Sequence, residues 1–437
     1  TVAYAKVAHM VNGLRPLGFV ERLFAEGNSQ FGAWLMVRVV RVSGPCDVER
    51  LRLAADRATR QLPFLMSTIS RQRNNPVLAE IRDFQLLFET VNRDSPERWQ
   101  QEAELQLERR LNVGAAQWRM AVIHSDTCTD WELLLVYNHA IADPVAATIH
   151  IERILREYQQ PTELVATIGE RSLPLELLLH KESTIRNSLR FLLEEIRISQ
   201  QQKTMAYFRR PQNLNAPVEL RRTRVRFAQL PATQTRQLLQ TAKQRSISLQ
   251  GLLLASMIRS SGDFLHDCNL PCLTLSNLSL RKECGPGDYS REPGCFVYWF
   301  MNRIHPGPTE NLLTLSQICT EHVRASIPRA RPPAPTFGAF VRKRIEQQAI
   351  GGNFGRLATV GVSNIGPVAL PEQIGELTVT EDYTITGQKA VGPEVMLLAS
   401  TFGGKLHLTC CFVEPLLASD QMTQFRDRLL TELTSFD

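Results

Sequence analysis

The most informative stretch of this sequence is LLVYNHAIADP, residues 134–144. Its first four residues are apolar or aromatic, and such residues suit a strand inside a sheet. A polar turn follows, in which His139 precedes Asp143 by four positions. Histidine changes its charge at a pKa of about 6.5, so a histidine delivered by a rigid strand is a candidate general base.

The residues after this turn predict a helix over positions 145–158, because apolar side chains recur there with helical spacing. Asp143 can cap that helix, and Pro144 suits its first position. Asp143 thus has a structural explanation that needs no chemistry. His139 has one too, as a histidine that is simply part of a turn or of the core. The pair at this spacing is stronger evidence for a site than either residue alone.

The chain has 437 residues, which is more than one ordinary compact core holds, so two domains or subdomains are expected. A polar, arginine-rich segment with prolines lies near the middle and predicts a linker over residues 209–222. We therefore predict an N-terminal subdomain over residues 1–208, which carries the histidine motif, and a C-terminal subdomain over residues 223–437.

The composition is that of an ordinary globular protein, with 43% hydrophobic and 22% charged residues. The net charge of +6 is a mild excess that does not favour nucleic acid, although it could favour an anionic partner. No apolar run approaches the roughly 20 residues that span a bilayer, and residues 1–18 lack the features of a signal peptide. The nine cysteines have no framework spacing, which favours free thiols and a cytoplasmic location.

Two segments share the order strand, turn, helix. In the first, residues 31–42 predict a strand, and Asp47 can cap the helix that follows. In the second, residues 222–227 predict a strand, and Ser248 can cap the second of two helices after it. We interpret this as a weak internal repeat, which predicts two related α/β layers.

The second half is rich in predicted strands, which cover residues 273–278, 295–301, 357–362, 395–402 and 406–413. Gly403 and Gly404 separate the last two and predict a hairpin. Helices are predicted over residues 185–208, before the linker, and over residues 418–433.

The histidine turn resembles the active-site motif His-His-x-x-x-Asp-Gly of the condensation-domain and chloramphenicol-acetyltransferase-like acyltransferases. This superfamily includes polyketide-associated and alcohol acyltransferases. The second histidine and the aspartate of the motif match His139 and Asp143. The first histidine is Asn138 here, and the glycine is Pro144, which adds bulk near the expected substrate channel.

Two more segments carry the resemblance. Residues 275–282, LSNLSLRK, are similar to a family segment whose arginine pairs with the motif aspartate, which implies an Asp143–Arg281 pair. Residues 361–367, GVSNIGP, resemble a Ser-Asn-x-Gly segment that faces the histidine. Ser363 or Asn364 would then bind the oxyanion or orient the acceptor, and Asn138 is a further candidate for substrate contact. The alternatives are a solvated arginine and an ordinary polar turn.

The resemblance implies an α/β fold of two chloramphenicol-acetyltransferase-like subdomains, arranged as a V-shaped pseudo-dimer with a central tunnel. It also implies an acyltransferase in which His139 is the general base. The acyl group would move from a thioester, either acyl-CoA or an acyl-carrier protein, to the hydroxyl or amine of a small molecule. The product would be an ester or amide of a secondary metabolite or lipid. Coenzyme A or a phosphopantetheine thioester would be the donor substrate, with no permanently bound cofactor.

Two other classes of function stay open. Pro144 leaves open a catalytically impaired condensation-like module that only binds a carrier protein. A cysteine- or metal-dependent hydrolase is less favoured. The His and Cys residues that could suggest zinc lack a tight Cys-x-x-Cys pair, so no metal site is expected; they are His266, Cys268, Cys272, Cys284 and Cys295. Residues 361–366 also lack the second glycine of a nucleophile elbow at the right position.

Overall fold

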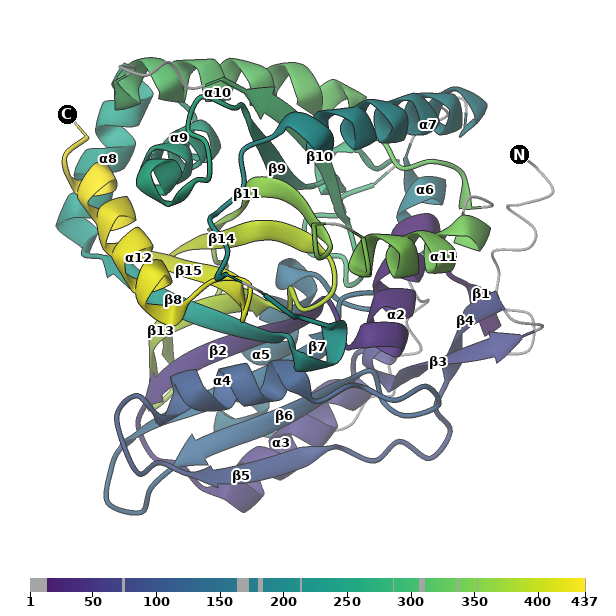
Figure 1. Cartoon of the computed structure of the whole chain (residues 1–437). Coiled ribbons are helices and arrows are strands. Elements are labelled where there is room, and N and C mark those ends of the chain that lie inside the picture. The colour runs from purple at the N-terminus through teal and green to yellow at the C-terminus, as the bar shows by residue number, and fades with distance from the viewer. Residues whose placement is uncertain are drawn as a thin grey trace.

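The computed structural model describes residues 14–72, 75–162, 173–179, 184–212, 214–285, 287–305, 311–335, 338–351 and 353–436. Two mixed six-stranded sheets dominate it, and each packs against helices. In Figure 1 the N-terminal half, in purple and blue, forms the lower part, and the C-terminal half lies above it in teal, green and yellow. The predicted α/β architecture with two layers is confirmed.

The first sheet has the strand order β12-β13-β2-β7-β6-β5. Its strands are β12 (Gln373–Ile374), β13 (Leu377–Thr386), β2 (Leu35–Ser43), β7 (Asp130–Asn138), β6 (Trp118–His124) and β5 (Phe88–Asn92). After Asp130, every residue of β7 is buried, because helices cover both faces of the sheet. Helices α3 (Val48–Arg60) and α5 (Pro144–Gln159) pack together against one face, and α4 (Arg98–Glu108) packs against the other.

The second sheet has the strand order β10-β9-β11-β14-β15-β8. Its strands are β10 (Val297–Ile304), β9 (Cys272–Ser279), β11 (Arg356–Pro367), β14 (Gly392–Phe402), β15 (Lys405–Glu414) and β8 (Arg222–Leu230). Four helices bury their apolar sides against its outer face (Figure 1). They are α8 (Ala232–Gln244), α9 (Leu249–Ser261), α10 (Leu312–Ser326) and α12 (Ser419–Thr434).

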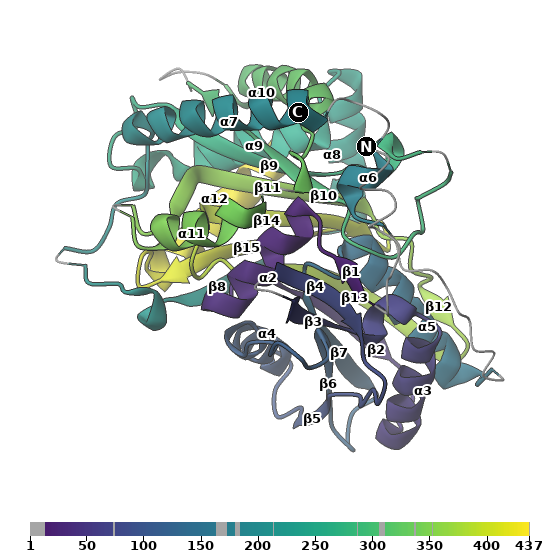
Figure 2. The same ribbon diagram turned by 90° about the vertical axis from the view of Figure 1, so that its right-hand side faces the viewer.

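The remaining elements include a small sheet of three strands in the order β1-β4-β3. The strands of this small sheet are β1 (Leu14–Pro16), β3 (Ser67–Gln72) and β4 (Asn75–Glu80). The other α-helices are α2 (Phe19–Phe31), α6 (Leu175–Leu178), α7 (Thr184–Gln201) and α11 (Gly338–Ala349). Helices α2 and α11 contact each other although the chain separates them widely (Figure 2). No helix among the described residues has both the length and the apolar character that crossing a bilayer requires.

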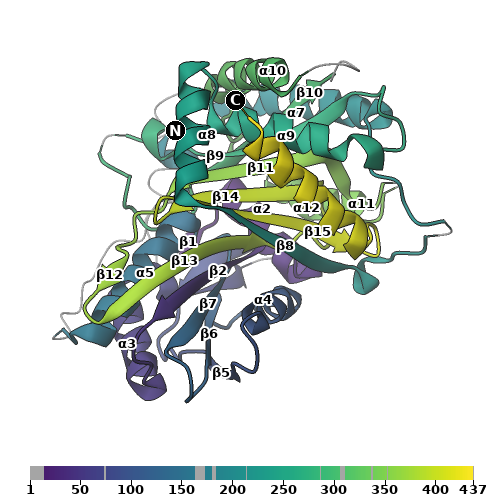
Figure 3. The same cartoon turned by 90° about the vertical axis from the view of Figure 1, so that its left-hand side faces the viewer.

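The chain exchanges a segment between its halves. Strand β13 belongs to the C-terminal half of the sequence but pairs with β2 in the first sheet, as Figure 3 shows. A third apolar cluster, which includes Trp99, Val225 and Tyr383, fills the space between the two sheets. The predicted linker over residues 209–222 ends at Arg222, the first residue of β8 in the second sheet, yet residues 373–386 return to the first sheet.

Several local predictions are confirmed. Asp47 caps α3 through Oδ1, which accepts from the backbone N–H of Arg50 at 3.0 Å. Ser248 caps α9 in the same way, and Gly403 and Gly404 both have positive φ in the hairpin between β14 and β15. The helix predicted over residues 185–208 was too long. It ends at Gln201 as α7, and Phe208 instead forms a β-bridge with Leu265.

One buried ion pair ties the exchanged strand to the first sheet. The Arg38 side chain on β2 is fully buried, and its Nη2 donates to Asp382 Oδ2 on β13 at 2.5 Å. Nη1 of the same guanidinium donates to the backbone carbonyl of Pro144 at 2.8 Å and to Thr148 Oγ1 at 3.0 Å. Arg38 therefore joins β2, β13 and the first turn of α5.

Replacing Asp382 with alanine should lower the free energy of unfolding by about 3–5 kcal/mol, because the Arg38 cation would stay buried without its partner. Urea denaturation followed by circular dichroism measures this change. The matched control is Asp56→Ala, which removes the partner of Arg60 in a pair that is 44% and 33% exposed. That variant should lose about 0.5 kcal/mol or less. Equal losses in the two variants would contradict the role given to the buried pair.

Candidate active site

A cavity of about 930 Å³, which we call the central cavity, lies between the two halves of the chain. Side chains of α2, β2, α5 and α7 line it from the first half, and side chains of β9, β10, α11, β11, β13 and β14 line it from the second. Most of the lining is apolar, with Phe24, Trp34 and Met396 among its larger side chains. Its size and its position between two subdomains are typical of a small-molecule site.

His139 lies at the end of β7 and lines the central cavity. Its imidazole stacks on the Phe24 ring, with the ring centroids 4.4 Å apart and the planes 9° from parallel. The turn is held by Asn138, whose Nδ2 donates to Gln117 Oε1 at 2.9 Å and whose Oδ1 accepts from the backbone N–H of Ala140 at 3.1 Å. The strand and the turn together fix the place of the ring.

Burial lowers the pKa of His139, since the surrounding protein disfavours the charged imidazolium. The nearby charge of Asp143 and the backbone carbonyls of His139 and Ala142 act in the opposite direction but do not cancel this effect. The ring is therefore neutral at pH 7, which is the state in which a histidine can accept a proton.

The Asp143 carboxylate is fully engaged with the protein. Its Oδ1 accepts from the backbone N–H of Ala146 at 3.0 Å and from Arg281 Nη2 at 2.9 Å. Its Oδ2 accepts from the backbone N–H of Phe296 at 3.1 Å. Asp143 is thus the cap of α5 and, at the same time, a link to the second half of the chain.

Arg281 occupies a short turn of 3₁₀ helix, η5 (Arg281–Glu283), directly after β9. Its Nη2 also donates to the backbone carbonyl of Glu292 at 2.9 Å. The guanidinium lies over the Phe296 ring, 4.0 Å from its centroid, which is a cation–π contact. The structure therefore brings Arg281 and Asp143 together, whereas a solvated strand-end arginine would have stayed apart.

Ser363 and Asn277 lie side by side on the paired strands β11 and β9, and both line the central cavity. The sequence singled out Ser363 but not Asn277, although Asn277 is part of the quoted segment 275–282. Asn364 points elsewhere: its Oδ1 accepts from the backbone N–H of Gly366 at 3.1 Å, and it is not part of the cavity lining. Asn138, as described above, holds the turn and is not part of the lining either.

Three further residues of the cavity wall are relevant to its specificity. Pro144 lines the cavity, so the residue in place of the motif glycine does face the site. Thr384 on β13 and Gln388 just after it are buried and also line the cavity. Thr384 Oγ1 and Gln388 Oε1 have no hydrogen-bond partner among the described residues. Sequence patterns missed both residues, because β13 was not predicted.

Cys295 is the cysteine beside the histidine, with its Sγ 4.0 Å from His139 Nδ1. Burial raises the pKa of this thiol well above its usual range, so the thiol is protonated at pH 7. Among the residues that the structure describes, no group of three or more His, Cys, Asp or Glu side chains could hold a metal ion.

Searches of protein-family models and of curated proteins find no match to this chain. Solved structures do match over almost its whole length. The trichothecene 15-O-acetyltransferase of Fusarium sporotrichioides is 12% identical, with 98% of this chain and 97% of that chain covered and a TM-score of 0.76. Polyketide synthase associated protein 5 of Mycobacterium tuberculosis is 15% identical, with coverages of 97% and 99% and a TM-score of 0.66.

The first condensation domain of the calcium-dependent antibiotic synthetase, in complex with a substrate analogue, is 12% identical. The alignment covers 97% of this chain and 96% of that domain, with a TM-score of 0.71. At such low identity these matches establish the fold. The chain has the fold of the condensation-domain and chloramphenicol-acetyltransferase-like superfamily, as the sequence resemblance predicted.

Replacing Asp143 with asparagine separates its two structural roles. Asparagine still caps a helix, but the buried Arg281 cation loses its counter-charge, so the free energy of unfolding should fall by about 3 kcal/mol. The control is Asp47→Asn at the exposed cap of α3, which should change it by about 0.5 kcal/mol or less. Urea denaturation measures both variants. A small, equal effect at the two caps would show that the Arg281 pair contributes nothing.

Proposed function

We propose that this protein is an acyltransferase in which His139 acts as general base. The acyl group would move from a thioester to the hydroxyl or amine of an acceptor molecule. The observation that carries the proposal is a neutral imidazole, fixed by β7 and the Phe24 ring, on the wall of a mostly apolar cavity between the two halves. A neutral base on the wall of such a cavity can accept the proton of a bound acceptor.

The reaction then follows from the chemistry of the residues. The acceptor oxygen or nitrogen attacks the thioester carbonyl carbon, and its proton passes to His139. The carbonyl oxygen becomes an oxyanion in the tetrahedral intermediate. When the intermediate collapses, the carbon–sulfur bond breaks, and the protonated His139 returns its proton to the thiolate. The step needs no acyl-enzyme, because the acceptor attacks the thioester directly.

Ser363 is the favoured donor to the oxyanion, and its neighbour Asn277 is a second one, since both side chains line the cavity that His139 lines. Asp143 and Arg281 serve as positioning residues. Their ion pair holds the start of α5 against the second half of the chain, and the turn that carries His139 leads directly into α5. The orphaned polar atoms of Thr384 and Gln388 are candidates for binding polar groups of the substrate.

The apolar lining and the cavity volume support a lipid or a secondary metabolite as a substrate. The acyl donor is either acyl-CoA or an acyl-carrier protein, and the product is an ester or an amide. Structurally similar proteins include an acetyltransferase and a condensation domain, which is in keeping with acyl transfer. The proposal places the protein in a soluble, cytoplasmic biosynthetic setting.

The second candidate function is a condensation-like module that binds a carrier protein without forming a bond. Pro144 is the observation that favours it, because this bulky, rigid residue lines the central cavity at the position of the motif glycine. The two candidates differ in turnover with a thioester donor, which only the acyltransferase gives.

Replacing His139 with alanine should reduce the rate of acyl transfer by roughly 10²–10⁴, the usual contribution of a general base. The assay combines a panel of acyl-CoA and acyl-carrier donors with alcohols and amines, and mass spectrometry reads the products. Cys295→Ala is the control, because its protonated thiol is not a nucleophile, and it should keep its turnover. Near-full activity of His139→Ala would remove that residue from the role of base, and loss of activity in Cys295→Ala would favour a cysteine enzyme.

The pH dependence follows from the lowered pKa of His139. The base is active when neutral, so kcat/KM should rise with pH through one ionisation below the ordinary value of about 6.5 and stay level above about pH 7. Initial rates measured in buffers from about pH 4.5 to about pH 8.5 give this profile. A rate that falls as pH rises through this range would mean that the active group is an acid.

A further inference from the structure

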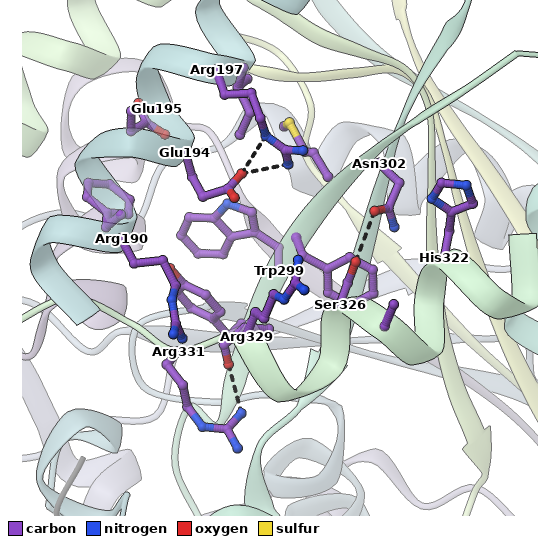
Figure 4. Close-up of a pocket in the computed structure, with 17 residues that line it drawn as sticks. Arg190, Glu194, Glu195, Arg197, Trp299, Asn302, His322, Ser326, Arg329 and Arg331 are labelled. Carbon is purple, nitrogen blue, oxygen red and sulfur yellow. Dashed lines mark hydrogen bonds and ion pairs between the residues drawn. The ribbon is translucent and has the colours of Figure 1, made fainter. Parts of the chain in front are cut away.

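A second cavity, of about 240 Å³, lies beside the central cavity, between α7, β10 and the end of α10. Figure 4 shows its lining. Arg190, Arg197, Arg329 and Arg331 line it together with His322. We call it the arginine pocket. Four guanidinium groups around one small space give it a positive field, which favours the binding of an anion.

The acidic residues of the pocket are already paired. Glu194 forms an ion pair with Arg197 at 2.6 Å, and Glu195 forms one with Arg344 at 3.1 Å. No ion pair among the described residues joins a carboxylate to any of the other three arginines of the pocket. In Figure 4 these three gather on one side of the pocket, and the Glu194–Arg197 pair lies on the other. The pocket therefore has an excess of positive charge on one wall.

The remaining lining suits a phosphate group. Arg331 is held in place because its Nη1 donates to the backbone carbonyls of Ile327 at 3.3 Å and Ala330 at 3.0 Å. Ser326 and Asn302 add a neutral polar pair, with Ser326 Oγ donating to Asn302 Oδ1 at 2.9 Å. Guanidinium groups bind phosphate oxygens through two parallel hydrogen bonds, which makes arginine the preferred residue for phosphate recognition.

The two cavities share a wall, since Phe191, Glu195, Ile198, Trp299 and Met301 line both of them. The arginine pocket thus adjoins the cavity that His139 lines, and Trp299 belongs to the wall between them. The two spaces differ in chemistry: the first is small and cationic, the second large and mostly apolar. The ligand that matches both has a phosphate at one end and a slender, uncharged arm at the other.

We propose that the arginine pocket binds the phosphate end of the pantetheine arm of the acyl donor, with Arg190, Arg329 and Arg331 as its ligands. The inference rests on the proposed acyl transfer and assigns the side of the molecule from which the thioester enters. The phosphate has two possible sources with the same chemistry, coenzyme A and the phosphodiester of a holo-carrier protein. The pocket recognises the group that they share.

The first experiment uses the unmodified protein and isothermal titration with coenzyme A, dephospho-coenzyme A and pantetheine. Coenzyme A and dephospho-coenzyme A both carry the phosphate next to the pantetheine arm and should bind alike, whereas pantetheine lacks it and should bind more weakly. The affinity for coenzyme A should also weaken as salt screens the charges. A second set of titrations uses holo- and apo-carrier protein, since only the holo form carries the phosphopantetheine. Equal affinity for coenzyme A and pantetheine, together with equal affinity for the two carrier forms, would overturn the proposal.

The second experiment changes the pocket. Arg190→Gln, Arg329→Gln and Arg331→Gln should each raise the dissociation constant of coenzyme A or of the holo-carrier about tenfold, the usual effect of losing one charge-assisted hydrogen bond. Affinity for pantetheine should stay the same in these variants. Arg236→Gln is the control, because Arg236 is an exposed arginine on α8, outside the pocket. It should bind like the parent, and the proposal is wrong if the pocket variants do so too.

These outcomes are distinct from those that test the proposed function. If the pocket variants weaken donor binding but no donor gives product, the pocket stands and the acyltransferase proposal fails. If the protein transfers acyl groups and the variants leave the KM of the donor unchanged, the function stands and the pocket assignment fails. Circular dichroism of each variant separates a loss of binding from a loss of folding.

Discussion

The arrangement of this site depends on one buried carboxylate. Asp143 accepts hydrogen bonds from Ala146 in the first half of the chain and from Arg281 and Phe296 in the second. A charge held by three donors is stable in the interior, where an unpaired one would cost several kcal/mol. Because its oxygens are all engaged, Asp143 does not compete for the substrate proton. The residue that caps a helix also joins two halves, and His139 lies four residues before it.

A second buried ion pair, between Arg38 and Asp382, also holds the start of α5. Arg38 joins Asp382 on the exchanged strand β13 to the backbone of Pro144, so a second buried arginine contacts the same helix start. Strand β13 also carries Thr384 into the wall of the central cavity. Strand β13 therefore has two roles: it joins the two halves of the chain, and it forms part of the cavity surface that a substrate would contact. In our proposal, the arginine pocket binds the acyl donor on the side of the molecule formed by α7 and α10.

The sequence predicted the parts of this site that are encoded locally. The strand before His139, the cap at Asp143 and the proline at the first helical position follow from residues that are close in the chain. The pair with Arg281 needed the resemblance to a family, since 138 residues separate the two partners. Strand β13 escaped prediction because its place is set by pairing with β2, which is far away in the sequence. Asn277 and Thr384 were missed because their places in the cavity wall also depend on pairing between strands that are far apart in the sequence. Two predicted substrate contacts have other partners: Asn138 donates to Gln117, and Asn364 accepts from the backbone of Gly366.

The central claim is that His139 is an uncharged imidazole at pH 7, held in the cavity between the halves. Nuclear magnetic resonance of the protein with ¹⁵N-labelled histidine measures this directly, and the spectrum of His139→Ala identifies the signals. We expect a neutral ring at pH 7, with a pKa below the ordinary histidine value of about 6.5. Replacing Asp143 with asparagine should lower this pKa further, because the negative charge of the aspartate favours the protonated ring. A ring that is charged at pH 7 would contradict the account.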